Sequence, residues 1–139
     1  MGIRHAVCAG VFALLLSGPV LAADTPEDLG QAAAESWLKL VDAGTFDVSW
    51  EQAAKFFKGA LTKTQWNDTL ARVRSPLGKV VSRKVVSRQY TEKIPGAPEG
   101  KYVIIQFETV FEKRASAVET VTPMLDPDGV WRVSGYFIR

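Results

Sequence analysis

The chain has 139 residues, and its 17 basic and 15 acidic side chains leave a formal net charge of +2. A net charge so close to zero predicts no particular class of partner. The single cysteine, Cys8, and the single histidine, His5, both lie near the start of the chain. If this first segment is removed, the rest of the protein can have no disulfide, no cysteine- or histidine-dependent catalysis and no Cys/His zinc or haem site.

The N-terminal segment has the three parts of a secretory signal peptide. Arg4 precedes an apolar run over residues 6–16, and Ser17-Gly18-Pro19 then ends any helix. Small residues follow at Ala22 and Ala23, and we expect cleavage after one of them. The apolar run is shorter than the roughly 20 residues that a membrane-spanning helix needs.

We therefore expect a cleaved signal peptide over residues 1–23 and one domain over residues 24–139. The mature protein is expected in the periplasm, without stable insertion into the membrane. Its length of about 116 residues is that of one ordinary domain and suffices to bury a core without disulfides. We expect no metal ion and no cofactor.

Residues 25–74 predict three helices, each with its own start signal. Thr25 is a capping residue followed by Pro26, while Ser49 and Thr62 each open a capping box. Apolar residues recur at helical spacing after each start. The expected helix ends are Gly44, Gly59 and Ser75-Pro76.

From Leu77 onward the pattern changes to that of strands joined by turns. The expected strands cover residues 80–90, 102–112, 117–125 and 130–138. In the second, Val103, Ile105, Phe107, Thr109 and Phe111 share one face. Short turns make successive strands antiparallel. The predicted fold class is α+β, with three N-terminal helices packed on one face of a curved four-stranded antiparallel sheet.

Charge is distributed unevenly along the chain. Residues 24–51 carry seven acids and one base, whereas residues 72–93 carry seven bases and one acid. The basic segment could bind an anionic partner. Alternatively, the two segments pack beside each other or form ordinary solvated faces, and we favour this interpretation. Nucleic acid is not an expected partner, since the basic segment lacks interleaved aromatic residues and the protein is expected to be exported.

Six polar side chains lie in predicted strands among apolar neighbours and form the candidate ligand-binding set. They are Gln106, Glu108, Glu119, Arg132, Ser134 and Tyr136. Arg132 could pair with Glu108 or Glu119 across strands on a solvated face. If they instead face a concave pocket, a carboxylate, a guanidinium and a phenol could hold an anionic or hydroxylated ligand. The four tryptophans could also line a pocket, although a core role is favoured.

Five stretches of the sequence match a known bacterial family in combination. They are Ala34-Glu35-Ser36-Trp37-Leu38, Ser49-Trp50-Glu51-Gln52-Ala53-Ala54, Arg74-Ser75-Pro76-Leu77-Gly78, Ser116-Ala117-Val118-Glu119-Thr120-Val121-Thr122 and Trp131-Arg132-Val133-Ser134-Gly135-Tyr136. They resemble the family called domain of unknown function 4019. The resemblance covers nearly the whole mature chain and implies an exported bacterial protein with no established activity. The last stretch also resembles the closing strand of nuclear-transport-factor-2-like domains, which implies a curved sheet around a helix and a cone-shaped cavity.

Two classes of function remain open. The first is a non-enzymatic periplasmic domain that binds a small molecule or a protein partner on the concave face of the sheet. The second is a histidine-free isomerase or lyase with Glu119 or Glu108 as general base, and with Tyr136 or Arg132 stabilising negative charge. We favour the first, because no spacing in the sequence enforces a catalytic constellation. The second requires Glu119 to lie in a cavity beside Tyr136.

Overall fold

The computed structural model describes residues 18–19 and 22–139. Most of the predicted signal peptide, residues 1–23, therefore lies outside the described residues. Within them, no helix is both long and apolar enough to cross a lipid bilayer.

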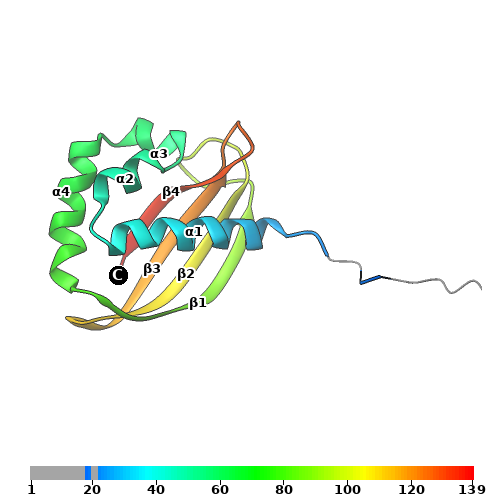
Figure 1. Ribbon diagram of the computed structural model, residues 1–139. Coiled ribbons are helices and arrows are strands. Elements are labelled where there is room, and N and C mark those ends of the chain that lie inside the picture. The colour runs from blue at the N-terminus through cyan, green and yellow to red at the C-terminus, as the bar shows by residue number, and fades with distance from the viewer. Residues whose placement is uncertain (1–17, 20–21) are drawn as a thin grey trace, which may run out of the picture.

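The described residues form four α-helices, all of which precede the strands (Figure 1). These are α1 (Pro26–Asp42), α2 (Phe46–Glu51), α3 (Lys55–Ala60) and α4 (Lys63–Val73), and a short 3₁₀ turn, η1 (Ser75–Leu77), follows them. The capping boxes predicted to start α1 and α4 are confirmed. The Thr25 hydroxyl accepts from the backbone N–H of Asp28 at 3.2 Å, and the Thr62 hydroxyl accepts from that of Gln65 at 3.1 Å.

The capping box predicted at Ser49 is wrong, and the single helix expected there is replaced by α2 and α3. Ser49 lies inside α2 and is buried. Its hydroxyl donates to the Phe46 carbonyl at 2.7 Å and accepts from the Trp66 indole at 2.9 Å. This tertiary use of the hydroxyl overrides the local capping pattern.

Four strands follow and form one open antiparallel sheet in the order β1-β2-β3-β4. They are β1 (Val80–Thr91), β2 (Tyr102–Phe111), β3 (Arg114–Leu125) and β4 (Trp131–Ile138). The α+β class with helices before a four-stranded antiparallel sheet is confirmed, with four helices in place of three. The strands curve in Figure 1, and irregular register, a mark of β-bulges, interrupts all three strand pairs.

The helices cover one face of the sheet, and the core lies between the two layers. Helix α1 crosses the sheet (Figure 1) and contacts all four strands. Its buried Trp37 and Leu38 pack in one cluster with Val103, Ile105 and Phe107 of β2. We call this side of the sheet the helical face. The opposite side, which carries Phe137, is the open face.

The closest approach of helix and sheet is at Gly30 of α1. A Cβ atom there would lie 2.9 Å from both Cβ and Cγ2 of Val103, which is inside van der Waals contact. A side chain at this position would therefore push α1 off β2.

We predict that Gly30→Ala lowers the free energy of unfolding by about 1–3 kcal/mol, because α1 or Val103 must shift. Urea denaturation followed by far-ultraviolet circular dichroism would measure it. The matched control is Gly59→Ala in α3, where no heavy atom lies within 4 Å of the added Cβ. That change should stabilise the protein by about 0.5–1 kcal/mol. Equal effects of the two substitutions would contradict the tight packing at Gly30.

Candidate functional site

The carboxylate of Glu119 in β3 binds side chains from all three other strands. Arg83 of β1 donates through Nε to Glu119 Oε1 at 2.8 Å, and the Thr109 hydroxyl of β2 donates to the same oxygen at 2.6 Å. The Tyr136 hydroxyl of β4 donates to Oε2. Glu119 is 0% exposed. The four strands are thus linked at one buried carboxylate on the helical face.

Arg83 continues this link to the end of α1. Its Nη1 and Nη2 donate to the two carboxylate oxygens of Asp42 at 2.7 and 3.0 Å. Asp42 also accepts from Nη2 of Arg74 at 3.3 Å. Two arginines and two acids therefore form one connected group, which we call the buried ion network: Asp42, Arg74, Arg83 and Glu119.

Arg74 connects the network to the segment between α4 and β1. Its Nη1 donates to the Gly78 carbonyl at 2.6 Å, and its guanidinium lies 4.6 Å from the centre of the Phe111 ring. Gly78 has a φ of +76°, which disfavours any residue with a side chain. The turn that enters β1 is therefore shaped by the glycine and held by the arginine.

The network accounts for part of the uneven charge along the sequence. Arg74 and Arg83 of the basic segment bind Asp42 of the acidic segment, and Arg88 binds Asp28 at 2.8 Å on the surface. The interpretation that the two segments pack beside each other is confirmed for these residues. Glu119 is the only network residue among the predicted site residues. The other three members, Asp42, Arg74 and Arg83, were not predicted.

The pKa values of two groups are shifted here: that of Arg83, within the network, and that of Tyr136, which donates to Glu119. Burial alone would lower the pKa of Arg83, but hydrogen bonds and charge from Asp42 and Glu119 outweigh this and raise it above its usual range. Burial, together with the neighbouring Glu119 carboxylate, raises the pKa of Tyr136 far above its usual range. Arg83 is thus fixed as a cation and Tyr136 as a neutral hydrogen-bond donor.

These contacts bear on the enzyme hypothesis. Glu119 does lie beside Tyr136, as that hypothesis requires, but a substrate could reach no exposed surface of the carboxylate. Both of its oxygens already accept hydrogen bonds. The concave side of the sheet is likewise filled, since Val103, Ile105 and Phe107 are at most 1% exposed. The geometry is that of a structural link between strands.

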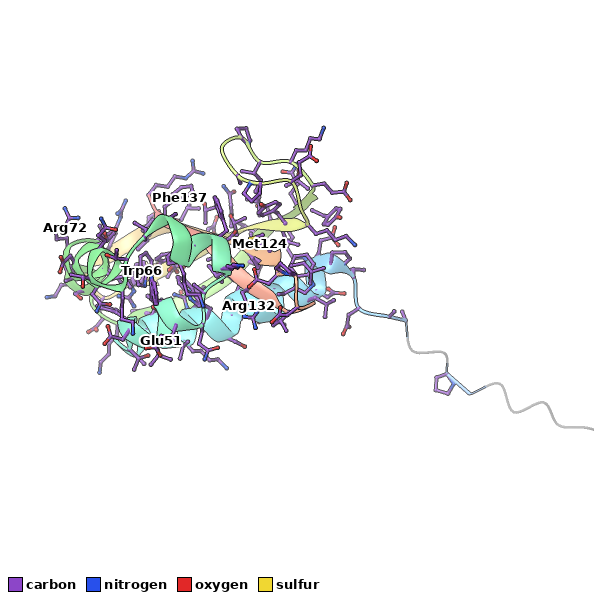
Figure 2. All side chains as sticks on the ribbon, turned by 90° about the horizontal axis from the view of Figure 1, so that it is seen from above. Glu51, Trp66, Arg72, Met124, Arg132 and Phe137 are labelled. Carbon is purple, nitrogen blue, oxygen red and sulfur yellow. The ribbon has the colours of Figure 1, made fainter. Side chains whose placement is uncertain are left out.

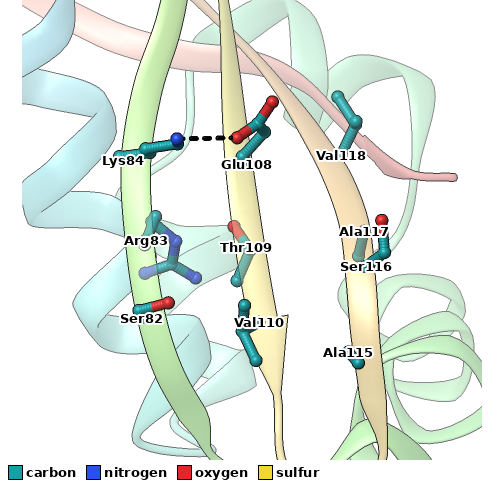
Figure 3. A pocket seen from close by; sticks show the side chains of 10 residues that line it. All are labelled: Ser82, Arg83, Lys84, Glu108, Thr109, Val110, Ala115, Ser116, Ala117 and Val118. Carbon is teal, nitrogen blue, oxygen red and sulfur yellow. Dashed lines mark ion pairs between the residues drawn. The ribbon is translucent and has the colours of Figure 1, made fainter.

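Gln106 and Glu108 lie on the open face, away from Glu119. Glu108 pairs with Lys84 at 3.0 Å, and both side chains are more than half exposed, at 55% and 73%. Figure 3 shows this pair on β1 and β2, with Ser116 and Val118 beside it on β3. The side chains line a shallow hollow of about 390 Å³. Gln106 accepts a hydrogen bond from Ser87 at 3.3 Å.

Ser134 and Arg132 lie apart from both groups. The Ser134 hydroxyl donates to the Thr122 carbonyl at 2.7 Å within the sheet. Arg132 binds Asp126 at 3.0 Å and Asp128 at 2.8 Å, both through Nη1. The pairing of Arg132 with Glu108 or Glu119, considered from the sequence, does not occur. The structure therefore separates the six predicted residues. Glu119 and Tyr136 meet at the network, Gln106 and Glu108 lie on the open face, Ser134 binds the backbone, and Arg132 binds the β3–β4 turn.

The tryptophans fall into two groups. In the first group the indole N–H is bound. Trp37 donates to the Ser49 carbonyl and Trp66 donates to the Ser49 hydroxyl. Trp50 donates to the Leu61 carbonyl. Trp37 and Trp66 also pack against Tyr136 in the core. The core role favoured from the sequence holds for Trp37 and Trp66, and Trp50 and Trp131 are partly buried against the same cluster. Trp131 is half-buried, and its indole N–H bonds to none of the described residues.

Trp131 lines an open groove between α1, α2 and the start of β4. The groove has a volume of about 330 Å³, and we call it the Trp131 groove. Its lining is mostly apolar and includes Ala33, Leu40, Val48, Val130 and Trp131. Ser36, Gln52 and Arg132 supply its polar atoms.

A second hollow of about 440 Å³ adjoins this groove and shares Gln52 and Arg132 with it. It is lined mainly by charged side chains of the α2–α3 segment and the β3–β4 turn, and we call it the lysine trough. Its charged residues are Glu51, Lys55, Lys58, Asp126, Asp128 and Arg132. Figure 2 labels Glu51 and Arg132 on the helical side of the molecule and Phe137 on the opposite side.

No group of three or more histidine, cysteine, aspartate or glutamate side chains in the described part of the chain is arranged to hold a metal ion. The neighbouring carboxylates Asp126 and Asp128 are both bound by Arg132. The chemistry that these hollows offer is apolar contact, an aromatic ring and charged groups.

The fold and these surfaces define a small α+β domain with a buried ionic centre and an aromatic surface groove. The family described as Protein of unknown function (DUF4019) matches residues 33–136, so the chain belongs to this family. The matched residues include the whole buried ion network and the Trp131 groove. No curated protein matches the chain. The likeness to nuclear-transport-factor-2-like domains stays a prediction.

We predict that Glu119→Gln lowers the free energy of unfolding by about 3 kcal/mol or more, because Arg83 loses a buried ionic partner. Glu108→Gln is the matched control, since it removes an exposed ion pair on the other face and should cost less than about 1 kcal/mol. Urea denaturation of both variants measures the difference. If Glu119→Gln were as mild as the control, the network would not contribute to stability.

We also predict that stability falls at high pH through Tyr136. Below about pH 10 this phenol is neutral in both states, so its contribution is fully present. Above about pH 10 the unfolded chain releases the proton whereas the folded protein retains it, so stability decreases by up to about 1.4 kcal/mol per pH unit.

Tyr136→Phe should therefore show a shallower loss of stability between about pH 9 and about pH 11 than the parent protein. Urea midpoints at several pH values give the two slopes. Identical slopes would show that the folded protein releases the Tyr136 proton as readily as the unfolded chain does.

Proposed function

We propose that this protein is an exported periplasmic domain that binds a protein partner through the Trp131 groove and catalyses no reaction. The observation that carries this proposal is Trp131 itself. Its indole is half-buried in a mostly apolar groove beside Arg132, and the indole N–H bonds to no residue of the described part of the chain. Tryptophan and arginine are the residue types that most often dominate the energy of protein interfaces.

The surroundings of Trp131 support a protein interface. Apolar side chains of Leu40, Val48 and Val130 line the groove together with the indole, and the charged lysine trough adjoins it. An apolar centre with a charged rim is the usual anatomy of such interfaces. Sites for small molecules enclose most of the ligand surface, whereas both hollows here are open, which favours a protein partner.

Export is supported by the N-terminal sequence, with Arg4, an apolar run and small residues at Ala22 and Ala23. A non-catalytic role is supported by Glu119, the best-placed base of the sequence-based enzyme hypothesis, which is buried and bound on both oxygens.

A single experiment in a Gram-negative host tests both export and docking at the groove. A photoreactive residue replaces Val48, which is 38% exposed and lines the groove. We expect a discrete cross-linked product in the periplasmic fraction, formed by a protein that begins at Ala23 or Asp24. Trp131→Ala should reduce the product strongly, because loss of an interface tryptophan costs about 2 kcal/mol or more of binding.

The matched control places the same photoreactive residue at Val73 of α4, which is 45% exposed and outside the groove. Thermal unfolding verifies that Trp131→Ala is folded. If positions 48 and 73 give the same products, or if Trp131→Ala changes nothing, the groove is not the docking site. An uncleaved protein in the cytoplasm would refute export.

A further inference from the structure

The Trp131 groove and the lysine trough form one continuous surface, because Gln52 and Arg132 line both. A ligand that places an apolar group beside Trp131 would therefore extend to the charged side chains of the trough. The charges that remain unpaired there decide which partner fits.

The carboxylates of the trough are all bound to cations. Asp126 and Asp128 accept from Arg132 at 3.0 and 2.8 Å. Glu51 pairs with Lys63 at 2.6 Å. Each carboxylate of the trough thus has a cationic partner, and the Asp126 oxygen that accepts no hydrogen bond from the described residues is buried.

The two lysines of the trough, by contrast, form no ion pair with any described residue. Lys55 is exposed, and the Lys58 ammonium donates one hydrogen bond within the described residues, to the backbone carbonyl of Glu51 at 3.3 Å. Arg132 uses Nη1 for both aspartates, which leaves Nε and Nη2 without a partner in the described part of the chain. Among the described residues, the charged side chains of the trough that lack an ion-pair partner are therefore the two lysines.

Resting on the proposed function, we infer that the partner presents an acidic peptide segment: an apolar or aromatic side chain enters the Trp131 groove, and neighbouring carboxylates bind Lys55 and Lys58. Charge complementarity of this kind raises the association rate and discriminates against basic partners. It also makes binding sensitive to salt, because the two lysines are near the surface.

Three labelled synthetic peptides of equal length test this inference by fluorescence anisotropy with the mature protein. Each contains Leu and Phe but no Trp. The remaining positions are Glu and Asp in the acidic peptide, Lys and Arg in the basic peptide, and Ser and Gly in the neutral peptide. We expect the acidic peptide to bind at least about ten-fold more tightly than the basic peptide at low salt. Its affinity should fall as salt is added.

Two variants assign the effect to residues. The double variant Lys55→Glu with Lys58→Glu should weaken the acidic peptide by about ten-fold or more and strengthen the basic one. The control Lys113→Glu changes an exposed lysine in the turn between β2 and β3 and should alter neither affinity. Trp131→Ala should weaken every peptide that binds, whatever its charge.

The outcomes separate this inference from the proposal on which it rests. In one outcome the three peptides bind equally, Trp131→Ala abolishes this binding and the lysine variant leaves it unchanged. That outcome would overturn the acidic partner but would still support docking at the groove. Binding that depends on the lysines but not on Trp131, or no binding by any of the three peptides, would overturn both.

Discussion

The structure depends on binding the Glu119 carboxylate in the interior. Removing a carboxylate from water is costly unless hydrogen bonds and an opposite charge offset the loss of hydration. Here the partners come from β1, β2 and β4. A slip of β3 by one residue would turn Glu119 to the open face and bring Val118 inward. The requirement to satisfy this one group therefore fixes the register of the sheet, and through Arg83 and Asp42 it also fixes the end of α1.

Much of the fold could be predicted because its signals are local. The capping residues Thr25 and Thr62 act within three residues of themselves, and the alternation in β2 separates buried from exposed side chains directly. Ser49 shows where this reasoning ends. Its sequence context satisfies a capping box, but its hydroxyl is bound by Trp66, 17 residues further along the chain. A contact at that separation leaves no trace in a local pattern.

The candidate sites were harder to predict, for the same reason. Polar residues in apolar strands indicate Glu119 and Tyr136, which do meet. Arg83 is 36 residues from Glu119, and nothing in the local sequence distinguishes it from the other bases of residues 72–93. Glu108 and Glu119 both stand among apolar neighbours in the sequence, yet they lie on opposite faces of the sheet. The Trp131 groove combines short segments of α1, α2 and β4. Only the adjacent pair of Trp131 and Arg132 could have indicated it.

The walls of the groove and trough are cross-linked to one another by hydrogen bonds. The Val133 carbonyl accepts from the N–H of Ala54 at 2.8 Å, and Asp126 accepts both from Arg132 and from the N–H of Lys55. Trp37 and Trp66 hold α2 from the other side through Ser49. Such a surface is preorganised, so a partner would bind it nearly as a rigid body and lose little conformational entropy on this side of the interface. The rate of association would then be set by diffusion, orientation and charge, without a folding step in this domain.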